Sequence, residues 1–119
     1  MKIKDNKNTE EYYFEEGCYI RELWNENTDE DVSVAQARVN PGESTKKHAL
    51  KNTIERYLIL KGEADVFIGD KKGQSVKAND VVIIPAGETQ FITNTSEKDL
   101  IFLAICSPRF NIENYREVN

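Results

Sequence analysis

The stretch PGESTKKHALKNTIERYLILKG, residues 41–62, decides how the rest of the chain is interpreted. It holds His48, the only histidine among the 119 residues, followed seven positions later by Glu55 and seven positions after that by Gly62. Glu55 to Leu60 has the composition of a strand, in which successive side chains point to opposite faces, so Glu55 shares one face with Tyr57 and Ile59. A carboxylate on an apolar face needs a partner, because burying an unpaired charge is costly. The stretch therefore predicts a strand that carries an ionisable group into the protein interior.

A second stretch, NDVVIIPAGETQFITN at residues 79–94, has a related layout of strand, Pro-Gly turn and strand. Together the two stretches resemble the two signature motifs of the cupin superfamily, whose members are small β-barrels. The resemblance extends from near Ala35 to Pro108. The matching positions are Gly42, His48, Glu55 and Gly62 in the first motif and Asp80, Pro85, Gly87 and Asn94 in the second.

The remaining sequence also indicates an all-β protein. Short runs with a period of two are separated by Gly, Pro and Asn turns, and residues 17–107 contain no helix-length amphipathic segment. The resemblance then implies a cupin double-stranded β-helix, the jelly-roll barrel. We expect residues 1–16 to be an N-terminal arm, either mobile or dimer-forming, 17–110 to be the barrel, and 111–119 to be a tail or short helix.

Composition excludes several classes of partner. The formal net charge is −5 and the pI is about 5.0, so nucleic acid is not an expected partner. The sequence shows no signal peptide and no apolar run of the ~20 residues that a membrane span needs, so no membrane partner is expected. We expect a cytoplasmic protein with Cys18 and Cys106 as reduced thiols. The basic cluster of Lys46, Lys47 and Lys51 is interpreted as a solvated loop, the alternative being a mouth that attracts anions.

The resemblance implies where a metal would bind. Cupins generally hold a divalent metal with three histidines and one glutamate, and the matching positions here supply His48, Glu55 and Gln90. The second histidine position is Leu50, which cannot ligate. We therefore expect one weakly bound divalent metal (zinc, nickel, manganese or iron) or none. Gln90 either offers its amide oxygen to that metal or hydrogen-bonds a ligand or Glu55.

The same positions give the other candidate site residues. His48, Leu50, Gln90 and Cys106 are predicted to line the ligand cavity, and His48 has the alternative of a hydrogen-bonded core histidine. If the protein is an enzyme, Glu55 is the expected base and Tyr57 the expected acid. Tyr57 and Cys106 can also be interpreted simply as buried core residues.

Two functions remain open from the sequence. The first is binding of a small polar metabolite inside a cupin barrel whose metal site is degenerate. The alternative is a metal-assisted or acid–base enzyme, resembling cupin sugar isomerases, epimerases or lyases; a dioxygenase is disfavoured because only one histidine is present. A homodimer is expected because aromatic residues gather near the N-terminus, at Tyr12, Tyr13, Phe14 and Trp24.

Overall fold

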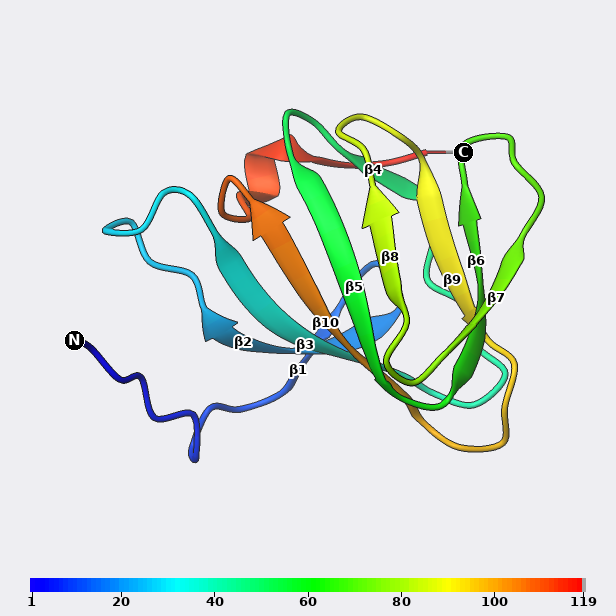
Figure 1. Cartoon of the computed structure of the whole chain (residues 1–119), viewed down its shortest axis with the longest axis horizontal. Helices are drawn as coiled ribbons and strands as arrows, with labels where there is room; N and C mark the ends of the chain where they lie inside the picture. Colours follow the sequence, from blue (N-terminus) through cyan, green and yellow to red (C-terminus); the bar gives the residue numbers. More distant parts are fainter. Residues whose placement is uncertain (119) are drawn as a thin grey trace.

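Two antiparallel sheets pack face to face and form the body of the structure (Figure 1). The structure is a computed structural model, and it describes residues 1–118. Its elements are β1 (Tyr12–Phe14), β2 (Cys18–Trp24), β3 (Ser33–Val39), β4 (His48–Leu50), β5 (Ile54–Lys61), β6 (Glu63–Ile68), β7 (Gln74–Lys77), β8 (Val81–Ile84), β9 (Gln90–Asn94), β10 (Leu100–Ser107), the 3₁₀ helix η1 (Ile112–Asn114) and β11 (Tyr115–Glu117).

The strand order confirms the predicted all-β jelly roll. One sheet has the order β1-β2-β3-β10-β5-β8 and the other β11-β4-β9-β6-β7, so strands far apart in sequence lie side by side. The alternation predicted for β5 is present, since Glu55, Tyr57 and Ile59 are buried and the residues between them are not. The inward faces of the two sheets enclose one core, to which Val39, Ile92, Leu100 and Phe102 also belong.

Gly62 of the first motif is required by the packing of its turn. Its φ is +94°, a conformation that side chains other than glycine rarely adopt. A Cβ added there would lie 3.0 Å from the Asp99 carbonyl oxygen and 3.2 Å from the Leu100 Cα. The turn between β5 and β6 therefore packs directly on the backbone that enters β10.

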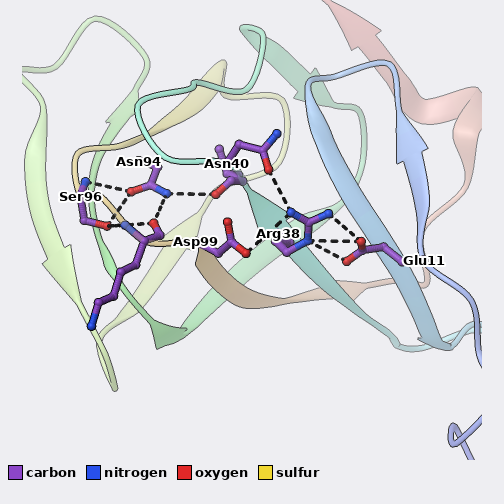
Figure 2. A network of polar contacts seen from close by, with 8 residues as sticks. Glu11, Arg38, Asn40, Asn94, Ser96 and Asp99 are labelled. Atoms are coloured by element: carbon purple, nitrogen blue, oxygen red, sulfur yellow. Dashed lines mark hydrogen bonds and ion pairs between the residues drawn. The ribbon is translucent and has the colours of Figure 1, made fainter.

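A polar network fixes the end of the barrel where β10 begins (Figure 2). The fully buried Asn94 side chain donates to the carbonyl oxygens of Val39 and Lys98, at 3.0 and 2.7 Å, and accepts from the Ser96 backbone N–H at 2.9 Å. Beside it, the Arg38 guanidinium donates to the Glu11 carboxylate at 2.8 Å. The second motif's asparagine thus closes the β9–β10 loop, and Arg38 ties the N-terminal arm to β3 (Figure 2).

The two ends of the chain take more part in the sheets than the sequence indicated. Tyr12–Phe14 forms edge strand β1 against β2, so this portion of the predicted arm belongs to the larger sheet. Asn111 caps η1 through its side chain, as expected for a short helix, but that helix ends at Asn114. Tyr115–Glu117 then forms β11 on the free edge of β4, a strand the sequence analysis did not predict. Asn119, the last residue of the predicted tail, lies outside the described residues.

Candidate functional site

A cavity lies inside the barrel at the end opposite the Asn94 network, where β5 begins and β10 ends. It offers about 60 Å³ to the centres of water-sized molecules, which is room for a compact ligand. Most of its wall is apolar or aromatic. The predicted site residues that line it are His48, Leu50, Glu55, Tyr57 and Cys106.

Gln90 does not line this cavity but connects two residues that do. It is buried at the start of β9, opposite His48 in the register of β4. The Tyr57 hydroxyl donates to the Gln90 amide oxygen, and the amide nitrogen donates to Glu55 Oε1 at 2.8 Å. Because an amide has distinct donor and acceptor ends, Gln90 orients both neighbours at once. The structure thus has the hydrogen-bonded arrangement, one of the two expected for Gln90.

Glu55 is a buried carboxyl group with few compensating donors. Besides Gln90, it accepts from the Cys106 thiol, whose Sγ lies 3.5 Å from Oε2. Burial and the nearby Glu16 carboxylate raise the pKa of Glu55 to about 7. Both the acid and the carboxylate are therefore accessible to Glu55 near neutral pH, which suits either ligand binding or proton transfer.

Glu16 is a second cavity carboxyl group, and it faces His48. The His48 Nδ1 lies 2.6 Å from the Lys46 carbonyl oxygen, which can only accept, so Nδ1 carries a proton. His48 Nε2 then faces Glu16 Oε2 at 3.2 Å. Burial lowers the pKa of His48 and raises the pKa of Glu16 to about 7. These directions place the shared proton on Glu16, which donates it to a neutral imidazole.

The β1–β2 turn positions Glu16 in the cavity wall. The Glu16 carbonyl accepts from the Lys46 N–H at 2.6 Å, which joins the turn to the segment leading into β4. Gly17 follows with φ +100°, and a Cβ there would lie 3.1 Å from the Ser44 carbonyl oxygen. Glu16 was not among the predicted site residues, because it lies in a polar turn outside both motifs. Its one sequence signal is the glycine that follows it.

The other residues around this pair are aromatic or sulfur-containing. Tyr115 of β11 stacks on the His48 ring, with centroids 5.4 Å apart and planes at 26°. Cys18 donates its thiol to Glu16 Oε1 at 3.1 Å. Burial raises the pKa of both thiols, Cys18 and Cys106, so neither is an activated nucleophile. Leu50 is buried and lines the cavity, as expected for the position that lost a histidine.

The donor set does not fit a preformed metal site. Within residues 1–118 no group of three or more His, Cys, Asp or Glu side chains is arranged to hold a metal ion. Two of the three expected ligands are already hydrogen-bonded within the protein. The Gln90 amide oxygen accepts from the Tyr57 hydroxyl, and the Glu55 carboxyl group accepts from Gln90 and Cys106. His48 turns Nε2 toward Glu16. The expected ligands are therefore bonded to one another or to neighbouring protein groups.

The comparisons agree with the architecture. The sequence model for the cupin domain matches residues 35–106, which is more than half of the chain. The chain therefore belongs to the cupin family, and its two sheets form the double-stranded β-helix of that family. Within residues 1–118 no helix has the length and apolar character needed to cross a membrane.

The proteins that resemble this chain carry different functional descriptions. An oxalate-binding protein of Thermotoga maritima is 39% identical over 71 residues, covering 60% of this chain and 58% of that protein. A structure described as a predicted oxalate decarboxylase, also from Thermotoga maritima, is 27% identical with a TM-score of 0.77, covering 91% of this chain and 99% of the other. Streptomyces Pac13, a nucleoside dehydratase, has a TM-score of 0.82 at 15% identity, covering 100% and 92%; this last likeness concerns the fold alone.

Proposed function

We propose that the chain binds a small polar molecule in the barrel cavity. The observation that carries this proposal is the concentration of ionisable groups in an otherwise apolar cavity: Glu16, His48 and Glu55 all line it. The cupin fold and a relative named for binding a small carboxylate support the same class of function.

The energetics of the buried carboxyl groups favour a ligand. Glu16 and Glu55 each have a pKa raised to about 7, so the folded protein meets a desolvation cost when either one ionises. Such perturbed groups facing one cavity mark a functional site more often than a structural one. A ligand with hydrogen-bond donors would supply partners to the carboxyl oxygens of Glu16 and Glu55.

Oxalate itself does not suit the side chains of this cavity. Among the described residues no lysine or arginine lines it, whereas the acidic residues Glu16, Glu22 and Glu55 do. A free dianion placed there would meet like charges at low dielectric, which is strongly unfavourable. We therefore propose that the ligand differs in charge from the one named for the Thermotoga protein.

A thermal-shift screen tests the binding proposal. The purified protein would be melted with a panel of anionic, neutral and cationic metabolites, each at millimolar concentration. A ligand present at about 100 times its Kd stabilises the folded state by about 2.7 kcal/mol, which raises the melting temperature by several degrees. Glu55→Gln should remove the ligand-induced rise in melting temperature or change which ligands produce it. Glu97→Gln on the exposed β9–β10 loop should leave that rise unchanged. Failure of all three charge classes would contradict the proposal.

Acid–base catalysis is the second candidate function. It is favoured by two proton-holding groups of near-neutral pKa in one cavity, Glu55 and the Glu16–His48 pair. Glu55 keeps the proposed role of base. The acid role expected for Tyr57 is better proposed for the Glu16–His48 pair, because burial raises the pKa of Tyr57 and its proton is held by Gln90. Product formation from a bound ligand, lost in Glu55→Gln while binding persists, would establish turnover.

We also propose a homodimer. Tyr12 and Tyr13 are exposed on edge strand β1, and Val81 and Ile83 are exposed on β8, the opposite edge of the same sheet. Exposed aromatic and aliphatic side chains on sheet edges are favoured at interfaces. Light scattering at micromolar concentration should give twice the mass of the chain, and a monomer would contradict this.

A cytoplasmic location is proposed from the thiols. Cys18 and Cys106 are free and buried, and each donates to a carboxylate in or beside the cavity. Buried free thiols are typical of reducing compartments. Fractionation of cells that produce the protein from its own gene would test this, and recovery in an oxidising compartment would contradict it.

A further inference from the structure

The aromatic content of the cavity wall goes beyond what a simple polar site requires. Both sheets and the C-terminal segment contribute aromatic rings to the cavity that Glu16 and Glu55 line. The rings belong to Tyr12, Phe14, Tyr57, Phe102, Phe110 and Tyr115. Phe14 packs edge-on against both Tyr115 and Phe110, with centroid distances of 5.2 and 6.4 Å. The faces of aromatic rings carry partial negative charge and attract cations.

Among the described residues no lysine or arginine lines this wall; Arg109 lies behind it, donating to the lining residue Asn25 at 2.9 Å and pairing with Glu30 at 3.4 Å. Lys46, the residue closest in sequence to His48 in the predicted basic cluster, is exposed and pairs with Glu117 at 3.7 Å. Arg38 is engaged by Glu11 at the other end of the barrel (Figure 2). The one basic group that lines the cavity within residues 1–118 is His48, and its contact with Glu16 leaves no net positive charge. With no lysine or arginine in the wall, ionisation of Glu16 and Glu55 makes the cavity negative, in a chain whose net charge is already −5.

An unpartnered hydroxyl group provides an independent indication of a ligand. The Tyr115 hydroxyl oxygen is buried and has no hydrogen-bond partner among the described residues, although Tyr115 lines the cavity. A buried hydroxyl left unpaired costs about 1–3 kcal/mol. Because Tyr115 stacks on His48, its position is fixed next to the Glu16–His48 pair. A donor on a ligand would satisfy it.

We infer that the ligand of this cavity is a small organic cation, an amine or quaternary ammonium compound, held by Glu16 and Glu55 within the aromatic wall. This inference rests on the proposed binding function and names the class of its ligand. Glu55 has one protein donor on each oxygen, so its remaining lone pairs can accept from an ammonium group or attract a quaternary one. The Tyr115 oxygen accepts from an N–H or O–H of the ligand. The aromatic faces add cation–π attraction.

Calorimetric titration with choline and its neutral carbon analogue tests the inference. The two molecules have the same shape, and a quaternary carbon replaces the nitrogen in the analogue, so the comparison isolates charge. We expect choline to bind at least about tenfold more tightly than the analogue, because one desolvated charge interaction changes the Kd by about that factor. Oxalate, the anionic probe, should not bind.

Matched glutamine variants identify which carboxyl groups account for the preference for choline over its neutral analogue. Glu16→Gln and Glu55→Gln conserve size and should each weaken choline binding by about tenfold, while Glu97→Gln should not change it. Melting curves of each variant would confirm that it is folded. Tighter binding of the analogue or of oxalate would overturn the inference and leave cavity binding intact. Absence of binding by all three probes would count against both the inference and the proposed function.

Discussion

The Glu16→Gln substitution should stabilise the protein at alkaline pH and have little effect at acidic pH. In the folded state the pKa of Glu16 is about 7, against an ordinary value of 4.5 expected when the chain is unfolded. The folded state therefore holds a proton that the unfolded chain releases earlier. The stabilisation from this protonated carboxyl is complete below about pH 4.5 and is lost as pH rises through about 7.

The magnitude follows from the difference in pKa. A difference of about 2.5 corresponds to about 3 kcal/mol of stability lost by the natural protein between about pH 4 and pH 8. Glutamine carries no charge at either pH, and its amide nitrogen can donate to His48 Nε2, 3.2 Å from the replaced oxygen. The variant avoids that loss and should be about 3 kcal/mol more stable than the natural protein at about pH 8.

Urea denaturation followed by circular dichroism at several pH values would measure this difference. The titratable groups that interact with Glu16 include Cys18, His48, Glu55 and Tyr115, so the effect belongs to a coupled cluster. Glu97→Gln provides the control, since that residue is exposed. If Glu16→Gln instead destabilises the protein at about pH 8, the pair is an ion pair between Glu16 carboxylate and protonated His48, and the assignment of the proton is wrong.

Three further variants, one of them a double substitution, test other parts of the account. Replacing Leu50 and Gln90 together by histidine should create tight divalent-metal binding, measured by calorimetry with zinc, nickel and manganese; tight stoichiometric metal in the unmodified protein would show that the ligands are misplaced. Asn94→Ala should lower the free energy of unfolding by about 2–4 kcal/mol in urea titrations, because the Val39 and Lys98 carbonyls lose their donor; a loss below about 1 kcal/mol would mean that the network is dispensable. Tyr57→Phe should free the Gln90 amide oxygen and weaken ligand binding several-fold with a loss of stability of about 1 kcal/mol; unchanged affinity would separate Tyr57 from the site.

The strands and the inward face of the barrel could be predicted from sequence because they depend on local patterns. The alternation from Glu55 to Leu60 places the carboxylate on the core face without any tertiary information. Gln90 and Asn94 are four residues apart in one strand, so the same rule places them on a common face, and both are buried. Side chains within one strand point in fixed relative directions, so the face that each residue occupies can be predicted without knowing the rest of the fold.

The site residues that were not predicted from the sequence, Glu16 and Tyr115, reach the cavity through contacts between distant segments. Glu16 reaches the cavity only because its turn docks on the segment at Lys46, and no periodicity in the sequence encodes that docking. Tyr115 belongs to a three-residue strand, too short to produce a pattern, whose position is set by packing on His48 and Phe14. The motifs therefore locate His48 and Glu55 but not the residues that complete the cavity around them.

The most direct test of the central claim is a crystal structure of the protein grown with choline. The account predicts electron density for the ligand inside the barrel, in contact with Glu16 and Glu55 and with the Tyr115 hydroxyl. Ligand density only on the outer surface, or a cavity filled by water alone at a choline concentration well above the calorimetric Kd, would contradict it.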